Sequence, residues 1–111
     1  MDDQNGNKSL QELLSVERER LLLVKFEASW CVPCKAMQRI LEKIADKYYD
    51  WLDAYSIDVD DDPDSAVSQR VRSVPTMILY NERGAEMKRW VGMTSRSDLE
   101  QVIDAHVEVR K

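Results

Sequence analysis

The sequence has no long apolar segment and no excess of basic residues, and each lack argues against a class of protein. None of its apolar runs approaches the ~20 residues that a helix needs to cross a bilayer. The formal net charge is −5, whereas a nucleic-acid-binding surface needs clustered lysine and arginine. Glycine and proline number only three each among 111 residues, which argues against a disordered or fibrous chain. We therefore expect a loose polar tail over residues 1–8 and one globular domain over 9–111.

Cysteine is equally scarce, since Cys31 and Cys34 are the only two and lie within the segment WCVPCK (30–35). A zinc site needs four ligands, typically from two such pairs or from cysteine and histidine. The only histidine, His106, is far away in the sequence, so a metal site within one chain is not expected, and only a metal shared between two chains stays open. A purely structural disulfide across so short a loop would remove little unfolded-state entropy. A reversible redox pair is the remaining interpretation.

Hydrophobic patterning predicts the strands. The run at 21–28 is nearly continuous and predicts a strand covered on both faces, as in a parallel sheet. Residues 52–59 and 73–80 predict a second and a third strand, and the alternating residues 85–92 predict a hairpin partner for the third. A strand-helix-strand unit followed by a hairpin and a helix predicts a small α/β sandwich.

Capping signals and a 3.6-residue period predict the helices. Ser9 begins an S-x-x-E capping box, with a buried stripe at Leu10, Leu13 and Leu14. A long amphipathic helix follows from Cys31, with Met37, Ile40, Leu41 and Ile44 on one face. Asp62 and Pro63 predict the start of a short helix, and a last helix is expected near Ser95 or Ser97.

The position of the cysteine pair, between a buried strand and an amphipathic helix, favours redox chemistry. Cys31 would lie at the helix N-terminus, where partial positive charge and free N–H groups stabilise a thiolate. Cys34 would lie one turn inside the helix, close enough to form a disulfide but less exposed. Pro33 is tolerated in the first turn because its missing N–H has no partner there. We therefore expect Cys31 to attack a disulfide and Cys34 to resolve the mixed disulfide.

These features resemble the thioredoxin family over nearly the whole chain. The resemblance implies the thioredoxin fold, a central mixed sheet with helices on both faces. The sheet would have four strands, or five if the family's first edge strand is present, although no convincing strand is predicted near the N-terminus. The segments that carry the match are LVKFEASWCVPCK (23–35), Ile57-Asp58, RVRSVPT (70–76), Gly84 and Val91-Gly92.

The resemblance also implies which residues surround the cysteines. Pro75 would follow a cis peptide bond and face the pair, and an extended substrate segment would dock along Val74 and the loop at Gly92. An apolar collar would surround Cys31. Its members are Trp30, Pro33, Val74, Pro75, Gly92 and Met93.

Two charged residues depart from the family pattern. Lys25 stands where thioredoxins carry a buried aspartate that helps to deprotonate the second cysteine, and Glu27 replaces an aromatic residue. Lys25 and Glu27 are two apart on a strand and therefore share a face. One hypothesis is a local ion pair in which both side chains reach water. The other is that Glu27 supplies the missing base for Cys34, while a charged Lys25 favours thiolates and makes the disulfide more oxidising.

The sequence thus predicts a thiol-disulfide oxidoreductase that reduces protein disulfides through Cys31 and Cys34, without a metal or an organic cofactor. The alternatives are a disulfide oxidase or isomerase, and a non-enzymatic adaptor that binds through the same collar. The resemblance implies disulfide-containing protein substrates and an electron donor such as a thioredoxin reductase or a membrane thiol donor. We expect a monomer.

The compartment has two interpretations. The N-terminus is acidic and polar, with no signal sequence, and predicts a cytoplasmic protein. The Val-Pro dipeptide between the cysteines is also found in exported thioredoxin-like reductases, where the familiar thioredoxin has Gly-Pro. A periplasmic or exported protein whose signal has been removed therefore remains the alternative.

Overall fold

The computed structural model describes residues 9–110, apart from the Arg110 side chain, and its strands and helices alternate as far as β3. The tail predicted over residues 1–8 lies outside this range. No helix in the described part of the chain is long and apolar enough to span a membrane. In chain order the elements are α1 (Leu10–Ser15), β1 (Leu21–Glu27), α2 (Val32–Lys47), β2 (Leu52–Asp58), α3 (Pro63–Ser68), β3 (Thr76–Tyr80), β4 (Glu86–Val91) and α4 (Arg96–Arg110).

The four strands form one mixed sheet in the order β2-β1-β3-β4. Strand β1 is parallel to β2 and antiparallel to β3, and β3 is antiparallel to β4. The predicted mixed sheet is therefore confirmed, and within residues 9–110 it has four strands. Between residue 9 and the start of β1 the structure has helix α1 rather than an edge strand.

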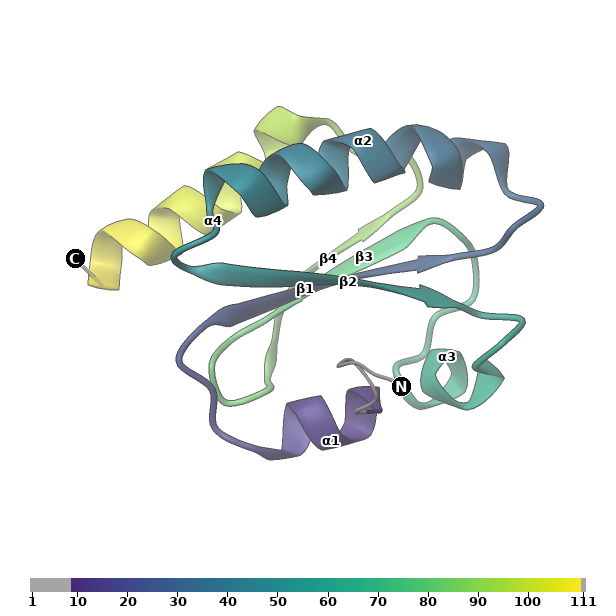
Figure 1. Ribbon diagram of the computed structural model, residues 1–111, viewed down its shortest axis with the longest axis horizontal. Helices are drawn as coiled ribbons and strands as arrows, with labels where there is room; N and C mark the ends of the chain where they lie inside the picture. The colour runs from purple at the N-terminus through teal and green to yellow at the C-terminus, as the bar shows by residue number, and fades with distance from the viewer. Residues whose placement is uncertain (1–8, 111) are drawn as a thin grey trace.

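Helices cover both faces of the sheet, with α2 and α4 on one face and α1 and α3 on the other (Figure 1). Because successive side chains of a strand point to opposite faces, β1 contributes to two cores. Leu21 and Leu23 pack in the core under α2 and α4, whereas Leu22, Val24 and Phe26 pack in the core against α1 and α3. The same alternation directs the odd-numbered residues that follow, Lys25 and Glu27, toward the α2 face.

The predicted helix starts are confirmed by their capping contacts. The Glu12 N–H donates to the Ser9 hydroxyl at 3.2 Å, and the Ser9 N–H donates to the Glu12 carboxylate at 3.1 Å. Asp62 accepts from the Ser65 N–H at 3.2 Å at the start of α3. In α1, Leu10 and Leu13 are buried as predicted, but Leu14 is only half-buried, because the helix ends one residue later at Ser15.

Two glycines with left-handed backbone differ in what surrounds them. Gly84, in the turn between β3 and β4, has φ of +84°, and a Cβ added there would lie 2.1 Å from the carbonyl oxygen of Leu14. Gly92, just after β4, has φ of +88°, and an added Cβ would meet nothing within 4 Å. The turn at Gly84 is therefore packed directly against the end of α1.

Replacing these glycines by alanine should separate backbone strain from packing. Gly92→Ala should lower the free energy of unfolding by about 1–2 kcal/mol, the usual penalty of a left-handed conformation for an L-residue. Gly84→Ala should lower it by about 4 kcal/mol or more, because a backbone clash is added to the same penalty. Urea unfolding of the two variants measures both losses. Equal losses would contradict the close packing of this turn on α1.

Candidate redox site at the start of helix α2

Cys31 and Cys34 form a disulfide where β1 leads into α2, with their Cα atoms 5.3 Å apart. Cys31 is the N-cap residue of α2, and its Sγ accepts a hydrogen bond from the Cys34 N–H at 3.2 Å. Pro33 lies in the first turn, as predicted. A thiolate at Cys31 would therefore have a helix N–H donor at hydrogen-bond distance and the positive end of the helix dipole beside it.

Both cysteines are buried in the disulfide form, and Cys34 is only slightly the less exposed of the two. Cys31 is 4% exposed and Cys34 is 2% exposed. Ala28 forms one apolar cluster with the two cysteines, and Val59 and Val74 pack against this cluster. Val59 follows β2 and was not singled out from the sequence. Position in the helix, rather than exposure in this state, distinguishes Cys31 from Cys34.

The Val74–Pro75 peptide bond is cis, as the resemblance implied. Val74 packs against the cysteine pair, and Pro75 is buried. The Pro75 carbonyl accepts a hydrogen bond from the Gly92 N–H at 2.8 Å. This bond joins the two predicted docking segments, so Val74, Pro75 and Gly92 lie together beside Cys31.

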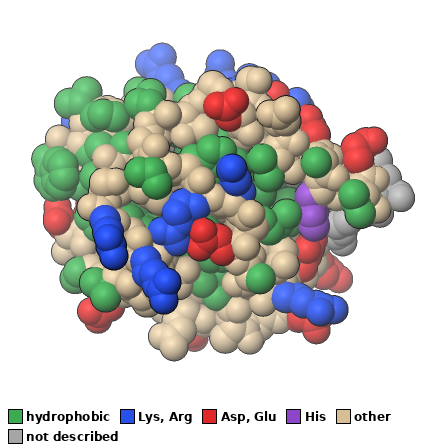
Figure 2. Space-filling model, turned by 180° about the vertical axis from the view of Figure 1, so that it is seen from behind, with side chains coloured by type: hydrophobic (Ala, Val, Ile, Leu, Met, Phe, Trp, Pro, Cys, Tyr) green, Lys and Arg blue, Asp and Glu red, His purple; other side chains and the backbone are tan. Residues whose placement is uncertain are grey.

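Apolar side chains are exposed around the cysteines. In Figure 2, the view from behind, hydrophobic side chains gather at the left end, where β1 leads into α2. Large hydrophobic side chains are exposed at Trp30 and Val32, where α2 begins, and at Val91 and Met93, at and after the end of β4. Patches of this kind mark interaction surfaces. A pocket of about 160 Å³ lies beside the pair, lined by Trp30, Val59, Ala66, Val71, Arg72, Ser73 and Val74.

Trp30 is held in place by a residue that no sequence pattern indicated. Its indole N–H donates to the Asp60 carboxylate at 2.9 Å. Asp60 lies in the acidic segment after β2, 30 residues further along the chain. The predicted collar residue therefore has a fixed orientation although its ring is exposed.

The loop before the cis-proline is held from β4 by Arg89. The Arg89 guanidinium donates to the carbonyl of Gln69 at 2.6 Å and to that of Arg70 at 3.0 Å. It also pairs with Glu86 at 2.9 Å; the hydrogen bond from Arg89 lowers the pKa of the Glu86 carboxyl group, and the bond to Glu86 raises the pKa of Arg89. Arg70 is a non-glycine residue with φ of 58°. Arg89 therefore fixes an unusual backbone segment that leads to Val74.

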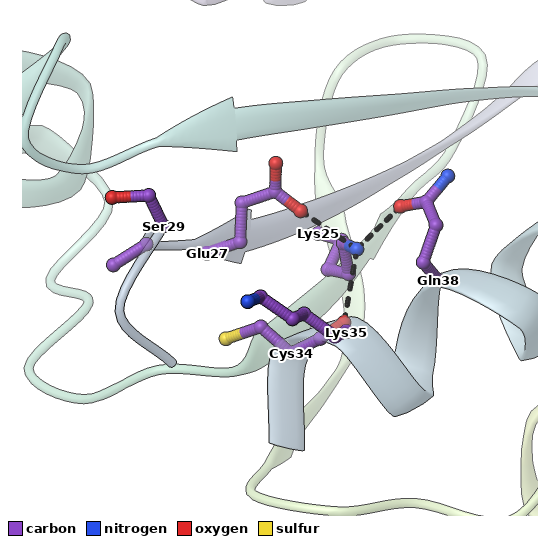
Figure 3. Close-up of a pocket in the computed structure, with 7 residues that line it drawn as sticks. Lys25, Glu27, Ser29, Cys34, Lys35 and Gln38 are labelled. Atoms are coloured by element: carbon purple, nitrogen blue, oxygen red, sulfur yellow. Dashed lines mark hydrogen bonds and ion pairs between the residues drawn. The ribbon is translucent and has the colours of Figure 1, made fainter. Parts of the chain in front are cut away.

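Lys25 lies beneath the cysteine pair and is 1% exposed. Its Nζ lies 2.7 Å from the Glu27 carboxylate, 2.5 Å from Gln38 Oε1 and 3.3 Å from the carbonyl oxygen of Cys34 (Figure 3). The predicted ion pair is confirmed, but the expectation that both side chains reach water is wrong for Lys25. Strand alternation directs Lys25 under α2, and only Glu27, at 30% exposure, reaches solvent.

Glu27 and Cys34 share a second pocket, of about 310 Å³. Its lining residues are Lys25, Glu27, Ala28, Ser29, Cys34, Lys35 and Gln38. A space of this size accommodates several water molecules. No hydrogen bond joins Glu27 directly to Cys34 among the described contacts, so any proton exchange between them would pass through water.

The ionisable residues elsewhere do not gather into a metal site. Within residues 9–110, no group of three or more His, Cys, Asp or Glu side chains could hold a metal ion. His106, on α4, lies 3.2 Å from the Glu82 carboxylate. The cysteine pair is thus the chemically reactive feature that the structure brings together with exposed apolar side chains.

Comparisons with known proteins agree on one family. The Thioredoxin family model matches residues 4–105. Thioredoxin from Staphylococcus aureus strain Mu50 is 36% identical over 85 residues, which cover 77% of this chain and 81% of that protein; the same figures hold for the protein from strain MW2. The crystal structure of thioredoxin NaTrxh from Nicotiana alata superposes with a TM-score of 0.74 at 34% identity, covering 87% of this chain and 80% of that one.

Arg89→Met should release the loop at residues 69–75. Removing the guanidinium leaves two carbonyl groups without their donor, which should lower the free energy of unfolding by about 1–3 kcal/mol. Arg96→Met is the matched control, because among the described contacts Arg96 pairs with the Glu100 side chain at the surface, and it should cost much less stability. Hydrogen exchange in residues 69–75 should accelerate in Arg89→Met alone. Unchanged exchange there would show that Arg89 does not hold the loop.

Proposed function

The chain belongs to the thioredoxin family, and we propose that it reduces protein disulfides with Cys31 as the attacking thiol and Cys34 as the resolving thiol. Membership of the family, together with a cysteine pair at disulfide distance, makes it a thiol-disulfide oxidoreductase. The observation that carries the assignment of roles is the placement of Cys31 as the N-cap of α2, with the Cys34 N–H directed at its Sγ.

The catalytic cycle consists of two thiol-disulfide exchanges. In the first, the Cys31 thiolate attacks one sulfur of the substrate disulfide, a bond from Cys31 Sγ to that sulfur forms, and the other substrate sulfur leaves as a thiolate. In the second, Cys34 loses its proton and attacks Cys31 Sγ. The Cys31–Cys34 bond forms as the mixed disulfide breaks, and the second substrate thiolate leaves. Two electrons pass to the substrate, and an external dithiol donor later restores the reduced pair.

The structure offers a candidate for the proton acceptor in the second exchange. The Glu27 carboxylate and Cys34 line the same pocket of about 310 Å³, and Glu27 reaches solvent. A carboxylate one water molecule away is within the range of general base catalysis. We therefore assign Glu27 as the base that accepts the Cys34 proton, and the ion pair with Lys25 fixes the position of its carboxylate.

Substrate docking is assigned to the apolar surface around Cys31. An extended substrate segment would lie along Val74 and the loop at Gly92, with Trp30 and Pro33 completing the collar. Support for this assignment comes from the hydrogen bond between Gly92 and Pro75 and from the exposure of Trp30. Disulfide-containing proteins are the substrate class, as the family indicates.

The proposal also covers the electron donor, the oligomeric state and the compartment. The electron donor is a thioredoxin reductase, and the chain acts as a monomer without a bound cofactor. The compartment is the cytoplasm, where thiols are kept reduced. An exported protein supplied by a membrane thiol donor is the alternative, and cell fractionation decides between the two. An oxidase, an isomerase and a non-enzymatic adaptor have no specific observation in their favour.

Serine variants of the two cysteines should have different consequences. Cys31→Ser should abolish the acceleration of insulin reduction by dithiothreitol that the unsubstituted chain provides, because the attacking thiolate is lost. Cys34→Ser should instead accumulate covalent mixed disulfides with the substrate, since nothing resolves them. Turbidity measures the first result, and non-reducing electrophoresis with mass spectrometry measures the second. Mixed disulfides that accumulate on Cys31→Ser rather than on Cys34→Ser would reverse the proposed roles.

A further inference from the structure

A charged side chain interrupts the buried face of the central strand. Residues Leu21–Phe26 of β1 are all buried, and Lys25 is the only charged residue among them. Lysine is almost never fully buried unless it is paired. Leu21 and Leu23, which share its face, belong to the core under α2. An apolar side chain at position 25 would continue this pattern, so the lysine calls for a function other than packing.

The contacts of the ammonium group account for its burial. A lysine ammonium has three N–H donors, and Nζ has three oxygen acceptors within 3.3 Å. They come from Glu27 on β1 and from Gln38 and the Cys34 carbonyl on α2 (Figure 3). The cation is thus fixed against the backbone of the resolving cysteine, on the inner side of the disulfide.

The compensating charges near the cation are unequally screened. Glu27 is 30% exposed and faces a pocket open to solvent, whereas Lys25 is 1% exposed. Water therefore weakens the field of the carboxylate more than that of the ammonium. Of the other charged groups nearby, Lys35 lines the same pocket and is exposed, and Asp60 is hydrogen-bonded to the Trp30 indole. Within the ion pair, the ammonium group is therefore the less screened charge, and it is the one in contact with the Cys34 backbone.

We infer that Lys25 sets the reduction potential of the Cys31–Cys34 pair, and that Glu27 partly offsets its effect. This inference rests on the proposed function. Reduction adds two electrons and one proton to the disulfide, breaks the S–S bond and yields one thiolate and one neutral thiol. A buried cation stabilises only the form that carries the thiolate, so it favours the reduced protein and raises the potential. Lys25 is a positioning residue in this role, because it acts through the cysteines and not on the substrate.

A raised potential restricts the substrate class. Structural disulfides of low potential resist a weaker reductant, whereas strained or exposed disulfides have higher potentials and are reduced more readily. The favoured substrates are therefore proteins with labile, surface-exposed disulfides. Catalytic and regulatory disulfides belong to this class.

Two substitutions that each replace a charged side chain by an uncharged one should shift the dithiol-disulfide equilibrium in glutathione buffers in opposite directions. Lys25→Met keeps the length of the side chain and removes the cation, so it should shift the dithiol-disulfide equilibrium about three- to tenfold toward the disulfide. Tenfold corresponds to about 30 mV for this two-electron couple. Glu27→Gln keeps an oxygen acceptor and removes the offsetting charge, so it should shift the equilibrium about twofold or more toward the dithiol. Quantifying free thiols in glutathione redox buffers at neutral pH measures both shifts.

Glu42→Gln is the matched control. Glu42 is an exposed carboxylate on α2 that accepts a hydrogen bond from Gln38 at 3.1 Å and does not line the pocket. Its substitution should leave the equilibrium unchanged. The inference would be overturned if Lys25→Met and Glu27→Gln shifted the dithiol-disulfide equilibrium in the same direction, or if neither variant shifted it.

Two further outcomes are distinguishable. If Lys25→Met does not fold, the Glu27→Gln variant decides alone, because residue 27 is partly exposed and glutamine has the size of glutamate. A reduction potential of the Cys31–Cys34 pair that is lowered or unchanged in Glu27→Gln would then overturn the inference. If the unsubstituted chain does not form and break a Cys31–Cys34 disulfide reversibly in glutathione redox buffers, the proposed function itself is overturned.

Discussion

Strand β1 is hydrogen-bonded to β2 on one side and to β3 on the other, and the position of every residue of the site depends on this pairing. Because β1 lies inside the sheet, its carboxyl end and the start of α2 are fixed relative to the neighbouring strands. The parallel partner β2 delivers Val59 and Asp60 to the same end, and the antiparallel partner β3 begins there, directly after the cis-proline. The cysteines, the docking loop and the residues that orient them thus meet at one edge.

Two sources of positive potential act on the cysteine pair from different sides. The N-terminus of α2 places the Cys34 N–H at 3.2 Å from Cys31 Sγ, and Lys25 places an ammonium group beneath the Cys34 carbonyl. The first follows from helix capping by Cys31, and the second follows from the alternation of β1. Both favour a thiolate over a neutral thiol or a disulfide. Local backbone geometry and one buried side chain together determine how readily this pair is reduced.

Much of this arrangement could be predicted from the sequence because its causes are local. Residues only a few positions apart determine the helix caps at Ser9 and Asp62 and the apolar run of β1. The spacing of the two cysteines indicates redox chemistry. The orienting contacts could not be predicted, because their partners are distant: Gln38 lies 13 residues from Lys25, and Asp60 lies 30 residues from Trp30. The burial of Lys25 also depends on its distant partner Gln38. The sequence alone therefore could not predict whether Lys25 is exposed to water.

The redox equilibrium of the unsubstituted chain with glutathione tests the central claim most directly. Thiols would be counted by alkylation and mass spectrometry across buffers of graded potential. We expect one two-electron transition between a Cys31–Cys34 disulfide and a dithiol, at a potential less negative than the value of about −270 mV typical of thioredoxin. A chain that stays reduced or oxidised throughout, or a transition at a more negative potential, would contradict it.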